Sequence, residues 1–112
     1  MKDKIETYIG FCVKSRKTVT GINALEAYKK KLYCILVCNT LSENSLNLVK
    51  KINGKFNVPI IKVCAKSLEQ ISFIQGCKVL ALTDLKLSSA VIENLNENYE
   101  IIEGLKTGVT HS

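Results

Sequence analysis

Three short apolar runs, separated by segments with helical spacing, constrain the fold of this chain more than any other feature. The first, LYCILVCN at residues 32–39, is a continuous apolar run of the kind expected of a β-strand covered on both faces. The runs NVPIIKVC (57–64) and CKVLAL (77–82) are also expected to be strands. Because each strand must be covered by a neighbouring helix, the alternation predicts an α/β fold. The expected architecture is a three-layer α/β/α sandwich with a small mixed central sheet.

Five segments around these runs have the apolar spacing, the caps or both that are typical of helices. The expected helices span residues 3–15, 22–30, 43–53, 68–75 and 84–95. Their recognisable N-caps are Ser42, the capping-box pair Ser67 and Gln70, and either Thr83 or Asp84. The three lysines at 29–31 are expected to close the second helix, where cations favour the C-terminal end of the dipole.

The 112 residues fit one domain, expected over 1–95, followed by a tail at 96–112. Within the tail, YEIIEGL is either an added edge strand or a segment that binds a partner, and the final residues are expected to be disordered. No apolar run reaches the ~18 residues of a membrane span, and the N-terminus lacks the apolar core of a signal peptide. We therefore expect a cytoplasmic protein with no membrane association.

The cysteines do not form a metal-binding or catalytic pattern. They are Cys12, Cys34, Cys38, Cys64 and Cys77. Cys34 and Cys38 are four residues apart on an expected strand, so they share a face and can pack there as small hydrophobic side chains. The single histidine, His111, lies near the C-terminus, so the internal sequence offers no histidine base for a thiol nucleophile. We expect no catalytic residue, metal, cofactor or small-molecule substrate, and keep a thiol enzyme as a third hypothesis.

The charge is unevenly placed along the chain. Residues 1–66 carry 13 Lys and Arg against four acids, a balance of +9, whereas residues 67–112 carry three Lys against six acids, a balance of −3. A basic field of this kind is typical of proteins that bind a polyanion such as nucleic acid, and also of a solvated lysine-rich surface. Charge alone leaves both interpretations open.

Four local motifs follow one another along the chain. They are YIGFCVKSRKTVTG (8–21), CILVCNTLSENS (34–45), FNVPIIKVCAKSLEQ (56–70) and KVLALTD (78–84). In this order, over roughly residues 5–95, they resemble the kink-turn-binding ribosomal protein superfamily. That superfamily includes archaeal and eukaryotic large-subunit ribosomal proteins and small bacterial relatives of the YlxQ and YbxF type. The resemblance implies a non-enzymatic protein that binds structured, kink-turn-like RNA, with the ribosome as a candidate partner.

The resemblance also implies which residues contact RNA. They are Gly21, Asn23, Lys14, Arg16, Lys17, Thr20, Ile74 and Gly76. Gly21 would allow close approach to the start of the second helix, Asn23 would contact a base edge, and the basic residues would contact phosphates. Ile74, as an exposed apolar side chain, and Gly76 belong to a second RNA-contacting loop.

Some positions depart from the family pattern. Ala24 and Ala27 stand where the family has Glu and Lys, and Glu69 and Phe73 replace two glycines that shape the second loop. These departures favour an alternative hypothesis, a protein-interaction module on the same fold whose RNA-binding surface is degenerate. Its partner would dock on the 96–112 tail or on the acidic C-terminal half.

Overall fold

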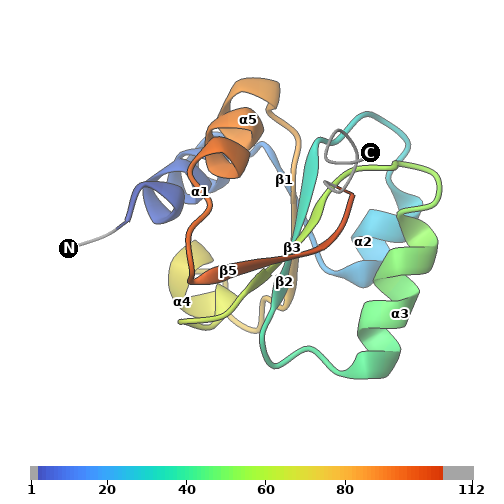
Figure 1. Ribbon diagram of the computed structural model, residues 1–112. Coiled ribbons are helices and arrows are strands. Elements are labelled where there is room, and N and C mark those ends of the chain that lie inside the picture. The colour runs from blue at the N-terminus through green and yellow to red at the C-terminus, as the bar shows by residue number, and fades with distance from the viewer. Residues whose placement is uncertain (1–2, 105–112) are drawn as a thin grey trace, which may run out of the picture.

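The computed structural model describes residues 3–104, in which helices and strands alternate (Figure 1). The helices are α1 (Lys4–Lys14), α2 (Ile22–Ala27), α3 (Glu43–Ile52), α4 (Leu68–Ser72) and α5 (Leu85–Glu93). The strands are β1 (Thr18–Thr20), β2 (Cys34–Cys38), β3 (Ile60–Val63), β4 (Val79–Leu82) and β5 (Tyr99–Glu103). Each of the three apolar runs contains a strand, although the strand is shorter than the run.

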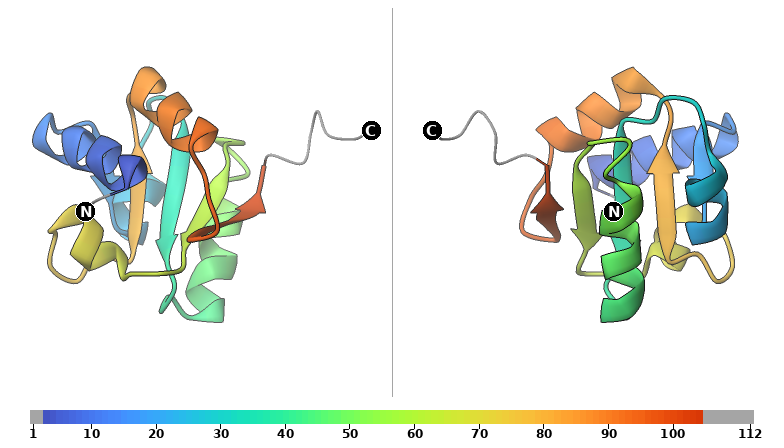
Figure 2. Two further views of the ribbon diagram at one scale, coloured as in Figure 1. Left: turned by 60° about the vertical axis from the view of Figure 1, so that its left-hand side comes forward. Right: turned by 90° about the vertical axis from the view of Figure 1, so that its right-hand side faces the viewer.

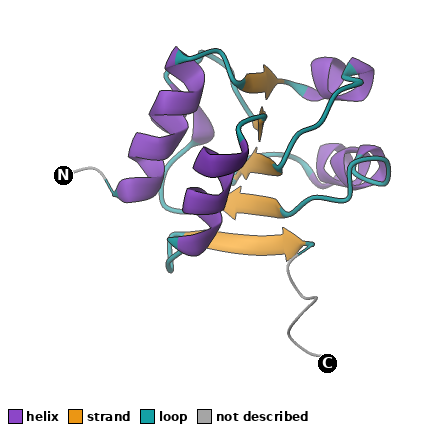
Figure 3. Cartoon of the chain, turned by 90° about the horizontal axis from the view of Figure 1, so that it is seen from above, coloured by secondary structure: helices purple, strands orange, loops and turns teal. Residues whose placement is uncertain are grey.

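The strands form one mixed sheet with the order β1-β4-β2-β3-β5. β2 and β3 are parallel, and the other neighbours are antiparallel. Seen along the layers, the sheet lies between two groups of helices (Figure 3). Helices α1, α4 and α5 cover one face, and α2 and α3 cover the other (Figure 1). The predicted three-layer α/β/α sandwich with a mixed central sheet is confirmed.

The alternation of side chains along β2 builds both hydrophobic cores. Cys34, Leu36 and Cys38 are buried against the layer of α1, α4 and α5, together with residues such as Ile5. The intervening Ile35 and Val37 are buried on the opposite face. The prediction that Cys34 and Cys38 share one apolar face is confirmed.

The predicted N-caps are present. The Ser42 hydroxyl accepts a hydrogen bond from a first-turn amide of α3. Ser67 and Gln70 form both halves of the capping box, at 3.2 Å from the Gln70 amide to Ser67 Oγ and 2.9 Å from the Ser67 amide to Gln70 Oε1. Of the two candidates for α5, Asp84 takes the cap rather than Thr83.

Helix α2 is shorter than predicted, ending at Ala27 instead of Lys30. In a continuing helix the Glu26 carbonyl would accept from the Lys30 amide. It accepts instead from the Lys55 ammonium, at 2.6 Å. The lysines at 29–31 therefore lie in the loop that leads to β2, and their placement on a helix was wrong.

Helix α4 is also shorter than predicted, ending at Ser72 rather than near residue 75. The next residue, Phe73, has a φ of 60° and terminates the helix in the left-handed conformation. A glycine usually takes this position, because it has no Cβ to strain there. The phenylalanine hides that stop signal in the sequence.

The folded unit continues past the boundary predicted after residue 95. β5 pairs antiparallel with β3 and forms one edge of the sheet (Figure 2). Of the two alternatives for this segment, the edge strand is present, and a domain ending at 95 was wrong. The disorder expected of the final residues concerns 105–112, which lie outside the described residues. Over residues 3–104, no helix is both long and apolar enough to cross a membrane.

Candidate nucleic-acid interface

Gly21 is the residue from which α2 begins. Its φ is 91°, a conformation that favours glycine. Because glycine has no side chain, the helix has no side-chain cap at this end. A Cβ built at Gly21 meets no atom within 4 Å, so the space in front of it is open. Glycine thus meets a backbone requirement here and at the same time leaves the helix start accessible.

Asn23 projects from the first turn of α2. Its side chain is exposed and has no hydrogen-bond partner among residues 3–104. The neighbouring Ala24 is exposed too. In the first turn of a helix the backbone amides have no intrahelical acceptor, so the amides of residues 22–24 are also available as donors. The surface therefore presents an amide side chain and backbone N–H groups, with no bulky side chain at residues 21 and 24.

The loop at 73–78 lies beside this helix start. The Gly21 amide donates to the Val79 carbonyl at 2.9 Å, and Thr20 is paired with Leu80 across β1 and β4. The end of the loop and the start of α2 are thereby joined. Gly76 is exposed within this loop, with a φ of 73° and no atom within 4 Å of an added Cβ. Four predicted residues thus occur at this end of β1 or in the adjoining loop: Thr20, Gly21, Asn23 and Gly76.

The prediction that Ile74 is the exposed apolar residue of this loop was wrong. Ile74 is half-buried and packs against the core on the α1, α4 and α5 side. Its amide donates to Ser72 Oγ at 3.1 Å, and its carbonyl accepts from Cys77 at 3.1 Å, which holds the residue in a tight turn. The apolar side chain that faces solvent is Phe73, which is 77% exposed.

Phe73 is a candidate contact residue that the sequence did not predict. Phe73 is the left-handed C-cap of α4 and the first residue of the loop at 73–78, and it lines a hollow with α1 residues such as Phe11 and Lys14. An exposed aromatic ring is a platform on which an unpaired base can stack. The signal in the sequence is the phenylalanine itself, which stands where the family has a glycine. Glu69, exposed in the first turn of α4, places a negative charge on the same helix.

Lys14, Arg16 and Lys17 are exposed but lie at the opposite end of β1 from Gly21. The Lys17 carbonyl accepts from the Thr83 amide, beyond the C-terminal end of β4, whereas Gly21 is bonded to the first residue of that strand. The Lys17 ammonium also forms an ion pair with Asp84, at 3.8 Å. The structure therefore places Lys17 at the other end of a strand about 10 Å long from the α2 start. Lys14 lines a hollow together with Phe73.

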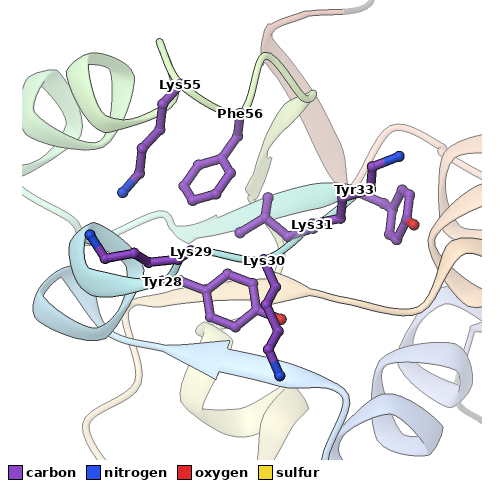
Figure 4. A pocket seen from close by; sticks show the side chains of 8 residues that line it. Tyr28, Lys29, Lys30, Lys31, Tyr33, Lys55 and Phe56 are labelled. Atoms are coloured by element: carbon purple, nitrogen blue, oxygen red, sulfur yellow. The ribbon is translucent and has the colours of Figure 1, made fainter.

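A second basic surface was not predicted as a site. It is a hollow of about 700 Å³ lined by residues 28–33 together with Lys55 and Phe56, which we call the lysine–aromatic hollow (Figure 4). Its lining brings the loop after α2 beside the turn after α3. Because these segments are far apart in the sequence, neither one alone identifies the hollow.

The thiols are mostly buried. Burial raises the pKa of Cys12 to about 11, with Asp84 adding to the shift, and burial raises the pKa of Cys34 to about 12. At Cys38, burial raises the pKa, but the Thr40 hydroxyl, the Leu68 amide and the charge of Lys78 lower it by more. The net result is a pKa below the ordinary value of a thiol. The Leu68 amide donates to Cys38 Sγ at 3.4 Å, so this thiol also accepts from the first residue of α4.

Comparisons with protein-family models and with curated protein sequences found no match. Among solved structures, the fold is similar to that of a protein with unknown function from Bacillus halodurans C. The TM-score is 0.68 and the sequence identity 13%, with 82% of this chain and 96% of that chain covered. At this identity the similarity shows a shared fold and assigns no activity.

Proposed function

We propose that the protein binds structured RNA of the kink-turn type without catalysing a reaction, with the ribosome as a candidate partner. The observation that carries the proposal is the open helix start at Gly21. It lies next to the exposed Asn23 and is joined to the loop that contains Gly76. The sequence motifs that resemble kink-turn-binding ribosomal proteins support the same surface.

Each part of this surface has a distinct role in the proposal. The Asn23 amide both donates and accepts, as needed to contact the edge of a base. Gly21 and the small side chain of Ala24 let an RNA backbone or base pair approach the free amides of α2. Phe73 and Gly76 form the second contact, in which a base would stack on the largely exposed phenylalanine side chain. The cations that precede β1 supply an attraction that depends on salt rather than on RNA structure.

Replacing Asn23 by alanine is expected to weaken binding to a kink-turn RNA by about 1–3 kcal/mol, because the base-edge contact is lost. Binding to a plain duplex should not change. Calorimetric titration of both RNAs measures the two affinities. Asn47→Ala, which removes an exposed amide on α3, is the matched control. An equal loss in the two variants would contradict the assigned role of Asn23.

Lys17→Ala should weaken kink-turn and duplex binding by the same factor. The side chain is exposed, lies away from the α2 start and contributes only charge in this account. The slope of log affinity against log salt should fall by about 1 for both RNAs if Lys17 contacts a phosphate. A loss confined to the kink-turn RNA would mean that Lys17 takes part in specific recognition.

The second candidate function is a protein-interaction module on the same fold. It is favoured by β5, which is an edge strand with Ile101 45% exposed and Glu100 exposed beside it. A sheet edge of this kind can receive a strand from a partner. A partner that stays bound after RNase treatment and at high salt would support this function, whereas loss of the complex under RNase would support RNA binding.

A further inference from the structure

We propose that the lysine–aromatic hollow is a second binding site, which takes a segment of single-stranded nucleic acid. It does not use Asn23 or the loop at 73–78, so it stands independently of the proposed kink-turn surface. The site is built from the loop after α2 and the turn after α3, which close around a space open to solvent.

The charge of the hollow selects a polyanion. Lys29, Lys30, Lys31 and Lys55 line it, and no acidic residue does. Among residues 3–104, none of these four lysines forms an ion pair with a carboxylate. Figure 4 shows the side chains of Lys29 and Lys55 extending to the same side of the hollow. Two ammonium groups placed this way can contact the phosphates of one strand.

Two contacts hold the Lys55 side chain in place. Its ammonium donates to the Glu26 carbonyl at 2.6 Å and lies 5.0 Å from the centre of the Phe56 ring. An ammonium has three donors, so Lys55 retains capacity for a phosphate oxygen. Its contacts at the C-terminal end of α2 and with the ring reduce the entropy that phosphate binding would otherwise cost.

The aromatic residues favour nucleic acid over an acidic peptide. The Tyr28 and Phe56 rings are half-buried, with centroids 6.5 Å apart and planes inclined by 42°. Because the rings are not parallel, a base does not fit flat between them. It stacks instead on Tyr28, since Lys55 lies over Phe56. A carboxylate-rich peptide would satisfy the lysines but leave the tyrosine ring unused, whereas a nucleotide engages both.

The test is a fluorescence-anisotropy titration of the full chain with a labelled oligouridylate of about 10 nucleotides. Lys29→Gln/Lys55→Gln should weaken binding roughly 10- to 30-fold at 0.1 M salt and lower the salt slope by about 1.4. The matched control is Lys4→Gln/Lys86→Gln, which removes the same charge from exposed positions on α1 and α5. An equal loss in the two double variants would overturn the proposal, as would no binding by the native chain.

Variants of Tyr28 provide the second part of the test. Tyr28→Leu should weaken oligouridylate binding at least about fivefold, and Tyr28→Phe, which keeps the ring, should bind like the native chain. If Tyr28→Leu fails to fold, the comparison of the two lysine double variants still tests the proposed site. Polyglutamate bound as tightly as the oligouridylate would overturn the proposal in favour of an acidic peptide.

Two further titrations place the site. Binding of oligothymidylate as well as oligouridylate supports a site that uses bases and phosphates, and binding of RNA alone supports one that also uses the 2′-hydroxyl. Asn23→Ala should leave oligouridylate affinity unchanged. A loss of that affinity in Asn23→Ala would overturn the separate site, so the two surfaces fail or succeed independently.

Discussion

Replacement of Asn53 by alanine is expected to lower the free energy of unfolding by about 3 kcal/mol, among the largest effects of a single side chain here. Asn53 is buried, and its amide bridges the turn between α3 and β3. Asn53 Nδ2 donates to the Val58 carbonyl at 2.8 Å, and the Val58 amide donates to Asn53 Oδ1 at 3.1 Å. Alanine would leave two buried backbone groups without partners, and each costs about 1–3 kcal/mol.

Denaturant unfolding measures this change directly, and the midpoint of thermal unfolding should fall by about 10 °C or more. Asn47→Ala is again the matched control, because it changes an exposed asparagine on the same helix and should stay within about 0.5 kcal/mol of the native chain. A stability of Asn53→Ala equal to that of the control would contradict the role of the bridge.

The backbone of the same residue shapes the turn at the proposed second site. The Asn53 backbone carbonyl accepts from the amides of Phe56 and Asn57, at 3.1 and 2.7 Å. Asn53 therefore organises the turn that presents Lys55 and Phe56 to the lysine–aromatic hollow. These two backbone bonds remain in Asn53→Ala, so we expect the folded variant to keep its oligouridylate affinity.

The second large effect is a loss of stability in alkaline solution. Burial raises the pKa of Cys34 to about 12 and that of Cys12 to about 11, against 9.0 for an ordinary thiol. Below pH 9 the thiols are protonated in both the folded and the unfolded chain, so they contribute no pH dependence. Above pH 9 the unfolded chain releases protons that the folded chain retains, and stability falls as pH rises.

Each such thiol lowers the free energy of unfolding by about 1.4 kcal/mol per pH unit in this window. Cys34 alone accounts for a loss on the order of 3 kcal/mol between pH 9 and 11, and Cys12 acts in the same direction. Burial and the neighbouring Asp3 also raise the pKa of Tyr99, so its phenol extends the loss of stability to higher pH. Denaturant titrations at several pH values, with a reductant present, measure the slope.

Cys34→Ala removes one of these groups and should reduce the alkaline slope by about 1.4 kcal/mol per pH unit, whatever its effect on stability at pH 7. The control is Asn47→Ala, which removes an exposed side chain that does not titrate and should keep the native slope. An unchanged slope in Cys34→Ala would show that the alkaline loss has another source.

Local patterns predicted the layers of this fold well. The alternation along β2, the Ser42 cap and the Ser67–Gln70 box depend on residues close in sequence, and each was predicted correctly. The end of α2 was not, because it depends on Lys55, which is 29 residues from Glu26 and takes the carbonyl that the next turn needs.

The candidate site divides in the same way. Gly21 and Asn23 were placed correctly at a helix start, since that feature is local. The exchange of Ile74 for Phe73 as the exposed residue follows from one left-handed residue at the end of α4, which the phenylalanine conceals. The distance of Lys17 from Gly21 follows from the extended strand β1 that separates them. Both features depend on local backbone conformation, which neither apolar spacing nor charge reveals.

The central claim is recognition of kink-turn RNA by the α2 start and the adjoining loop. The most direct test is a calorimetric titration of the native chain with a kink-turn RNA. The comparison is the same RNA with its tandem sheared G·A pairs replaced by Watson–Crick pairs, at about 100 mM salt. We expect the kink-turn to bind at least about tenfold more tightly than the straight duplex. Equal affinities for the two RNAs would contradict the claim.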